Sequence, residues 1–476
     1  MDLGGWAFAL HSKYGDTFEI YFGPIRVIIM GTPEALEKFY NPSMENKFSG
    51  RPKMNGFSEL KLDNGIFFNN NLKSRRRNRR LVSQALLSAK FLHGFISNTQ
   101  DLFIQAERYW TFGTVVDLAS WSKHFLFDII VSNSTGRKSN YVLAYNTPKS
   151  EYTPDMIKSN EFHDLTKTWL DSFPFFLMLP KFLRVYVPGI NSLNKYYLKS
   201  AERLDNEILT EITKHRKQLE NLSESQTGKP SLLDMLLTFN ARNPDDCVVP
   251  DDYIESAKPS GYEEEPMKDR EICDSALDII LAGTDSTADS LCNFIYNMAN
   301  NPQCKKRLIE EIDSVFADDM TRPVKYDDLK KLVYMDAAIK ESLRFSPVVP
   351  LVMRSVSDTD TLLGYEWRAG EIFFVSHYGL LNNKNVWSDP RKFNPDRFLE
   401  GLNANEKRCY IPFGNGDRMC PGRHMAITEI KTLIALLFRK YDIELVDKNA
   451  PLDYTYKGTF FCNKLLVKLN ERRFEK

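Results

Sequence analysis

The sequence predicts one mostly helical domain, residues 1–476, with a minor β-sheet. Three observations support this fold class. Stretches with helical hydrophobic periodicity fill the middle of the chain, and short apolar runs punctuated by Pro, Gly and Asp flank them. No internal repeat is visible. With 42% hydrophobic and 26% charged residues, the composition is that of an ordinary globular protein.

The first predicted elements are a strand pair and a short helix. Residues 17–33 are rich in aromatic and β-branched side chains and are interrupted by Gly-Pro, as in a hairpin. PEALEKFY then indicates a helix with Pro at its first position. Long helices are predicted after it, and the clearest examples are 196–220, 271–300 and 302–317.

The second half alternates loop, sheet and helix. Residues 241–268 are polar, acidic and Pro-rich, and we expect a mobile surface loop between two helices. From 347 to 398, short apolar runs between Pro, Gly and Asp predict a small sheet. A final helix fits 421–440, and hairpin-like segments follow it.

Charge and cysteine content exclude several classes of function. Lys+Arg and Asp+Glu both total 63, so no global field favours a nucleic-acid partner. The seven scattered cysteines form no CxxC pair, which argues against a zinc site or a disulfide framework. No apolar run reaches the length of about 18 residues that a membrane-spanning helix needs.

The sharpest motif is FGNGDRMCPG, residues 413–422. Its glycines would let backbone amides approach a sulfur and hold it ionised. Cys420 would lie just before the N-terminus of the final helix, where negative charge is favoured. Arg418 could pair with an anionic cofactor group. Without further motifs, a glycine-rich turn around a buried cysteine is more often structural.

This loop resembles the haem loop of the cytochrome P-450 family, Phe-x-x-Gly-x-Arg-x-Cys-x-Gly, at every fixed position. The resemblance, of the eukaryotic microsomal type, implies the cytochrome P-450 fold, with haem b (iron protoporphyrin IX) between the Ala282 helix and the Cys420 helix. Cys420 would be the axial iron ligand. The cofactor would also contact Phe413, Gly416, Arg418 and Gly422.

A second motif places Glu341 and Arg344 three apart on one helix face. Such a pair alone is common and is usually a weak surface ion pair. Arg397, in FNPDRF, offers a second cation. The order of these segments resembles the family's structural triad, which implies that Glu341, Arg344 and Arg397 brace the core beside the haem.

Two further arginines resemble the family's partners of the haem carboxylates, which need charge-assisted hydrogen bonds. Arg354 follows the helix that carries Arg344. Arg79 lies in KSRRRNRRLVSQAL, which resembles the family's Trp-x-x-x-Arg helix. Arg75 stands at the Trp position, so either Arg75 takes over the donor role or the alignment slips by one residue.

In the middle of the helix ALDIILAGTDSTADS, a Gly, an acid and hydroxyls interrupt an otherwise apolar run. Hydroxyls that bond to carbonyls one turn back would explain them structurally. The alternative is that Gly283 permits a local widening of the helix, and that Asp285, Ser286 and Thr287 deliver protons to bound dioxygen. The motif resembles the family's Ala-Gly-x-Asp/Glu-Thr-Thr signature, with Ser286 at the first Thr.

Together the motifs imply a haem-thiolate monooxygenase that inserts one oxygen atom from O2 into a lipophilic small molecule, namely a sterol, fatty acid or xenobiotic. The chain has no flavin fingerprint or ferredoxin-like cysteine cluster. Electrons would therefore come from an NADPH-cytochrome reductase or a ferredoxin. The basic run 73–80, with Arg76, Arg77 and Arg80 partly facing solvent, would form a docking patch with Lys407, Arg408 and Arg423. The other interpretation of this run is a solvated helix face.

Two other functions compete with monooxygenation. A reductase-independent enzyme that rearranges peroxides would generally lack the acid–alcohol pair at 285–286. A haem-based gas sensor would gain nothing obvious from that pair. Product analysis with NADPH, reductase and candidate lipids would separate the three.

Membrane contact and location are also expectations of the family resemblance. The Phe-rich stretch 172–184 carries Lys181 and Arg184 and could touch a membrane surface or simply cap the pocket. Microsomal relatives carry an N-terminal anchor before the segment that begins this chain. We therefore expect a protein of the cytosolic face of the endoplasmic reticulum membrane with its anchor missing, or alternatively a cytoplasmic one.

Overall fold

The computed structural model describes residues 10–11, 13–22, 25–41, 46–52, 56, 59–60, 63–221, 229–238, 265–456 and 458–472. The chain divides into two compact units, residues 1–52, 107–123 and 285–476 in the first and 53–106 and 124–284 in the second. Most of the predicted loop 241–268 lies outside the described residues. The single domain expected from the sequence stays a prediction.

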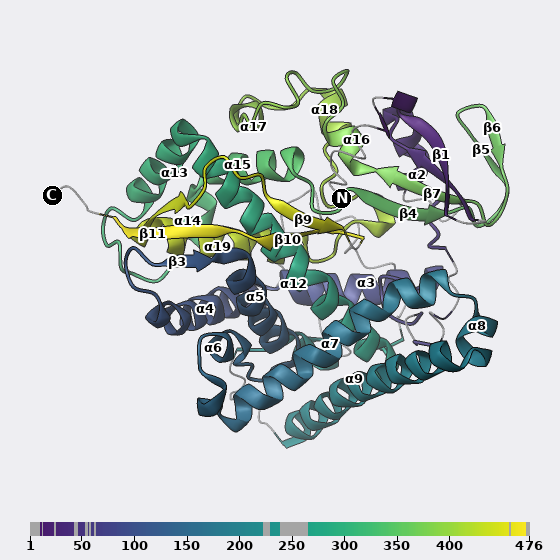
Figure 1. Cartoon of the computed structure of the whole chain (residues 1–476), viewed down its shortest axis with the longest axis horizontal. Helices are drawn as coiled ribbons and strands as arrows, with labels where there is room; N and C mark the ends of the chain where they lie inside the picture. Colours follow the sequence, from purple (N-terminus) through teal and green to yellow (C-terminus); the bar gives the residue numbers. More distant parts are fainter. Residues whose placement is uncertain are drawn as a thin grey trace. The chain divides into compact units, whose positions relative to one another are not determined.

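The first unit contains a four-stranded sheet of order β1-β2-β7-β4 (Figure 1). β1 (Thr17–Phe22) pairs antiparallel with β2 (Ile25–Met30), as the hairpin pattern predicts. β2 then pairs in parallel with β7 (Ile372–Ser376), which is antiparallel to β4 (Leu351–Ser355). β5 (Asp360–Leu362) and β6 (Tyr365–Trp367) form a separate hairpin.

The core beside this sheet is aromatic. The rings of Phe39, Phe48 and Phe373 meet in edge-on contacts with centroids 5.3–5.9 Å apart, the geometry that ring quadrupoles favour. Phe39 comes from α2 (Leu36–Tyr40), which follows the 3-10 turn Pro33–Ala35. This packing fixes α2 against the sheet.

The remaining strands of the first unit lie near the C-terminus. β3 (Val115–Asp117), β11 (Leu466–Glu471) and β8 (Tyr441–Leu445) form an antiparallel sheet, and β9 (Asp453–Tyr456) pairs with β10 (Phe460–Lys464). Its helices are α13 (Pro302–Val315), α14 (Tyr326–Lys331), α15 (Val333–Phe345), α16 (His377–Leu381), α17 (Asp396–Leu399), α18 (Ala404–Cys409) and α19 (Arg423–Lys440).

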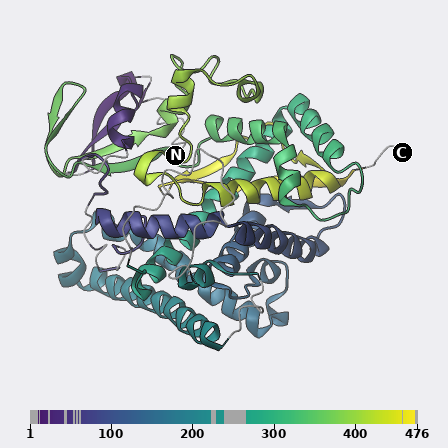
Figure 2. The ribbon, with the colours of Figure 1, turned by 180° about the vertical axis from the view of Figure 1, so that it is seen from behind.

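The second unit is helical. Its long helices are α3 (Leu72–Leu87), α4 (Ala89–Ala106), α7 (Pro154–Met178) and α9 (Pro188–Asn221), with the short α6 (Tyr141–Tyr145), α8 (Lys181–Tyr186) and α10 (Leu232–Thr238). α7 and α9 lie side by side (Figure 1, Figure 2). α5 (Leu118–Thr135) and α12 (Asp269–Asn300) each run from one unit into the other. The mainly helical fold with a minor sheet is confirmed.

None of the described helices is long and apolar enough to cross a membrane.

Candidate functional site

The loop before α19 has the compact geometry that its glycines allow. The Cys420 amide donates to the Phe413 carbonyl at 2.9 Å, which folds the loop back on itself. Gly414 and Gly416 both have positive φ, +71° and +62°. At Gly416 a Cβ would also collide with the Tyr40 carbonyl, so α2 and the loop approach as closely as they do because residue 416 has no side chain.

Cys420 lies at the head of α19, because Gly422 is the N-cap of that helix. A Cβ at Gly422 would touch the Cys420 sulfur at 3.9 Å, so the glycine leaves the sulfur's surroundings open. Of the described cysteines, four are buried and two, Cys304 and Cys420, are partly exposed. A partly exposed sulfur at a helix N-terminus suits a thiolate ligand.

Two arginines that the sequence predicts as cofactor partners lie in different elements of the first unit. Arg418 belongs to the loop before α19, and Arg354 belongs to β4. Arg418 donates from Nε to the Ser49 carbonyl at 3.2 Å, which ties the loop to the segment after α2. Arg354, in β4, is only 1% exposed and donates from Nη1 to the Met353 carbonyl at 3.0 Å. Among the described residues Arg354 forms no ion pair, and its Nε has no hydrogen-bond partner. A buried guanidinium in this state is a binding group for an anion.

Three residues near Arg354 belong to no motif and were missed by the sequence reasoning. The ring of Tyr40 faces the Arg354 guanidinium at 5.5 Å, and the Tyr40 hydroxyl is hydrogen-bonded to His377 Nε2 at 2.6 Å. Arg51 donates to the Met353 carbonyl at 2.8 Å. Burial, followed by the charges of Arg354 and Arg51, lowers the pKa of His377 to about 3, so the imidazole is neutral.

Arg79 and Arg75 both lie on the buried face of α3, one helical turn apart. The substitution of Trp by Arg75 therefore places a second guanidinium on the inward face. Arg77 is partly exposed, as expected, but the exposed fraction of its side chain is only 15% because it forms an ion pair with Glu271. Glu271 is the first-turn acid that attracts it.

α12 stays α-helical from Asp269 to Asn300, so the widening predicted at Gly283 is absent. The glycine instead permits close packing, because a Cβ there would lie 3.4 Å from Ile130 Cδ1. Thr284 and Ser290 bond back to carbonyls at Ile280 and Ser286. Ala282 is exposed, although residues 272–280 of the same helix are buried.

Asp285 and Ser286 are partly exposed, whereas Thr287 is buried. All three belong to the first unit, as does Cys420. One turn further on, Asp289 is completely buried and accepts from the Cys462 amide at 2.9 Å, with Lys123 Nζ 3.7 Å away. Burial raises the pKa of Asp289 to about 7. Asp289 lies within the sequence ALDIILAGTDSTADS, but the sequence reasoning gave it no role.

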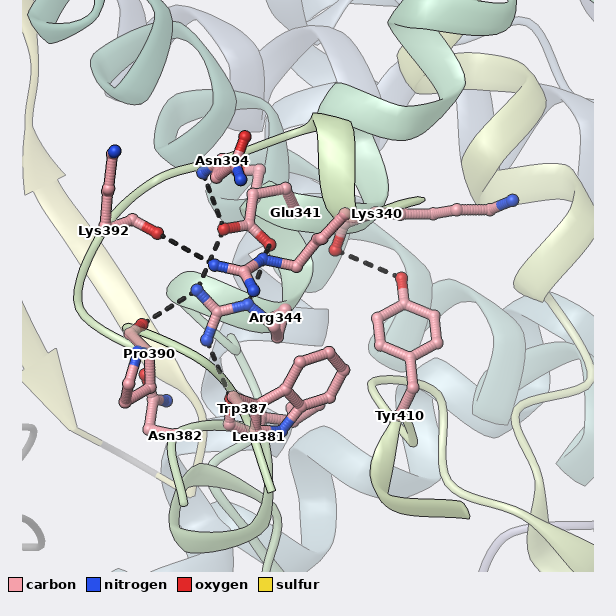
Figure 3. A network of polar contacts seen from close by, with 12 residues as sticks. Lys340, Glu341, Arg344, Leu381, Asn382, Trp387, Pro390, Lys392, Asn394 and Tyr410 are labelled. Carbon is pink, nitrogen blue, oxygen red and sulfur yellow. Dashed lines mark hydrogen bonds and ion pairs between the residues drawn. The ribbon is translucent and has the colours of Figure 1, made fainter. Parts of the chain in front are cut away.

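Glu341 and Arg344 pair in the interior of the first unit (Figure 3), and Arg397 joins the same carboxylate. Arg344 donates to both carboxylate oxygens of Glu341, at 2.7 and 2.9 Å, and Arg397 Nε lies 3.2 Å from the same carboxylate. The remaining Arg344 donors reach the carbonyls of Leu381 and Pro390. The cluster thus joins α15, the end of α16 and the segment that leads into α17.

The Phe-rich stretch 172–184 also differs from expectation. Arg184 is fully buried, because it pairs with Glu59 at 3.0 Å and stacks on Phe176, so it offers no surface charge. Phe182 and Tyr186 of α8 are exposed, by 61% and 80%, beside the exposed Lys181. The second unit also contains a polar cavity of about 310 Å³. It is lined by residues of α4, α5 and 229–231, and no residue of 172–184 lines it.

Comparison with known proteins gives a consistent result. The family model described as cytochrome P-450 matches residues 6–470. Cytochrome P-450 4d1 of Drosophila melanogaster is 26% identical over 442 residues, which are 91% of this chain and 81% of the relative. Protopine 6-monooxygenase of Eschscholzia californica is 25% identical over 467 residues, or 94% and 83% of the two chains. The crystal structure of the cytochrome P-450DA haem domain superposes with a TM-score of 0.76 at 18% identity, covering 99% and 93% of the chains.

Proposed function

The chain belongs to the cytochrome P-450 family and is a monooxygenase of that family, and from this premise we propose that it inserts one oxygen atom from O2 into a lipophilic small molecule. Sterols, fatty acids and xenobiotics are the candidate substrates. The observation that carries the proposal is the partly exposed Cys420 sulfur in a glycine loop at the head of α19.

The family implies a haem, and we propose haem b. The residues of the first unit fit such a group in two respects. The buried Arg354 guanidinium lacks an anionic partner among the described residues, and a haem carboxylate would supply one. The partly exposed Cys420 sulfur lies at the head of α19, where a thiolate ligand to iron is favoured. When bound, a haem with a thiolate ligand supplies the cleavage of the O–O bond.

In this proposal each site residue has one task. Cys420 binds the iron, and Phe413, Gly416 and Gly422 shape the loop around the sulfur. Arg354, Arg418 and Arg79 bind the carboxylates of the cofactor. Asp285 and Ser286, with Thr287 beside them, hold and transfer the protons that oxygen activation consumes. Glu341, Arg344 and Arg397 act only as a brace.

The acid and the alcohol at 285 and 286 favour this reaction over peroxide rearrangement, which needs no proton delivery. Gas sensing would leave the pair without a task. We propose an external NADPH-cytochrome reductase or ferredoxin as the electron donor. We also propose a place at the cytosolic face of the endoplasmic reticulum, where Phe182 and Tyr186 would enter the membrane surface.

The proposal is tested by spectroscopy and product analysis. The reduced CO complex should show the strongly red-shifted Soret band of thiolate ligation, and Cys420→His should abolish that band even if haem is retained. Cys304→Ala, which removes the other partly exposed sulfur, is the control and should keep it. NADPH, reductase and a sterol and fatty-acid panel should then yield an oxygenated product. A Cys420→Ala variant that retained the band would refute the assignment.

A further inference from the structure

The buried pair Tyr40–His377 lies beside Arg354 and has no role in the function proposed above. Tyr40 comes from the end of α2, and His377 begins α16 directly after β7. Both side chains are buried, and the 2.6 Å hydrogen bond between the Tyr40 hydroxyl and His377 Nε2 joins them. A buried polar pair of this kind needs all of its protons accepted.

Counting protons shows that one of them is left over. The neutral imidazole has one N–H and the phenol one O–H, but a single hydrogen bond joins the two groups. If Tyr40 donates to Nε2, the imidazole proton is on Nδ1, which is buried and has no partner among the described residues. If His377 donates instead, the hydroxyl proton of Tyr40 has no second partner in the part of the chain that the structure describes. Either way the pair presents one unused donor.

The surroundings of this donor are cationic. Arg354 and Arg51 both act electrostatically on His377 and on Tyr40, and no carboxylate is among the groups that shift either residue's pKa. The Nε of Arg354 is a further donor that lacks an acceptor among the described side chains and backbone. Unused donors and buried positive charge at one place require an anion with several acceptor lone pairs.

We propose that the Tyr40–His377 pair is part of the carboxylate site for the cofactor, in which the Tyr40 hydroxyl fixes the His377 tautomer and His377 Nδ1 donates to a haem carboxylate that Arg354 also binds. The inference rests on the proposed haem function. Tyr40 is a positioning residue, because it acts through His377 and through the face of its ring toward Arg354.

The test measures the rate at which the holoenzyme loses haem to an excess of apomyoglobin. His377→Leu should accelerate the loss roughly tenfold, the effect of deleting a hydrogen bond to a charged group. Tyr40→Phe keeps the ring over Arg354 but removes the hydroxyl that fixes the tautomer of His377. Because the proton of His377 can then lie on either nitrogen, we expect about a threefold acceleration of haem loss. Tyr410→Phe is the control, since it deletes a partly buried hydroxyl that donates to the Lys340 carbonyl at 3.2 Å, and it should leave the rate unchanged.

Reconstitution with haem analogues that lack one or the other propionate makes the test specific. The His377→Leu effect should disappear with the analogue that lacks the contacted propionate and persist with the other. Equal acceleration with all three haems would show a general loss of packing and would overturn the inference, as would no acceleration in any of them. A wild-type protein that retains no haem at all would instead refute the proposed function.

Discussion

The residues of the proposed proton-delivery motif in α12 differ in how strongly their surroundings constrain them. The hydroxyls of Thr284 and Ser290 donate hydrogen bonds to carbonyls one turn back in α12. Asp285 and Ser286 lie between them in the sequence and are partly exposed. The sequence could not separate these hydroxyls, because all of them fit the same apolar helix. Their assignment depends on the hydrogen bonds that each one makes.

Ser286→Ala should leave CO binding intact and divert reducing equivalents from product to hydrogen peroxide. The physical reason is the loss of a proton-transfer group, which typically costs about 100-fold in the rate of the productive step. Product and peroxide formed per NADPH are the quantities to measure. Ser290→Ala, one turn further along and bonded to the Ser286 carbonyl, is the control. Normal coupling in both Ser286→Ala and Asp285→Asn would contradict the proton-delivery role.

At the scale of elements, the Glu341 cluster and helix α3 show where local sequence is informative and where it is not. The ExxR spacing predicts that Glu341 and Arg344 share a helix face, but their burial depends on Trp387 and the carbonyls around it, which no local pattern reveals. In α3, helical periodicity identifies an inward face for Arg79. It could not predict that Arg77 turns to Glu271, because that partner is nearly 200 positions away.

Glu341→Gln should strongly destabilise the protein. It leaves the buried Arg344 and Arg397 without their shared counter-charge, which costs about 3–5 kcal/mol of unfolding free energy. Denaturant unfolding of the purified variants measures this. Asp396→Asn breaks the exposed Arg307–Asp396 pair in the same unit and should change stability by less than about 1 kcal/mol. Similar losses in both variants would rule out a bracing role.

Lys73→Glu with Arg76→Glu should slow the transfer of electrons from the reductase at low ionic strength and leave peroxide-driven turnover normal. A reversed patch loses the electrostatic steering of an acidic partner, and salt should reduce the difference. Stopped-flow reduction measures the rate. Arg77→Glu is unsuitable as part of this test, because it would also break the pair with Glu271. A wild-type reduction rate in the double variant would place the docking surface elsewhere.

At the scale of the whole molecule, the sequence predicts where helices and strands lie along the chain better than it predicts which of them pack or pair together. The hairpin at 17–33, the helix after it and the final helix all occur close to their predicted positions. The parallel pairing of β2 with β7 was not predictable, since Val27 and its partner Ile372 are brought together by the folded core and not by a turn. Tyr40 and His377 were missed for the same reason.

The stability of the molecule should depend on pH through Asp289. Its folded pKa of about 7 lies above the ordinary 3.8, so the folded state binds more protons between these values and the free energy of unfolding falls as pH rises through them. The loss is at most ~4 kcal/mol. Asp289→Asn should flatten this dependence. Compared with the wild type at the same pH, the variant should gain stability at pH 8, where the wild-type carboxyl is ionised, and should gain less at pH 4. Chemical denaturation across pH 4–8 checks it, with the exposed Asp327→Asn as control. An unchanged pH slope in Asp289→Asn would disprove the effect.

The contact between the cysteine loop and the segment after α2 also bears on how the chain acquires its cofactor. Arg418 and Ser49 are separated by 369 positions, and Gly416 rests against Tyr40. A ribosome therefore makes Ser49 well before it makes Arg418, with 369 positions of chain between them. Contacts of such long range close slowly, because chain entropy opposes them until the rest of the core has formed. The loop that carries Cys420 can therefore reach its final position only after residues 49–418 have been made, and stable haem capture must follow their synthesis.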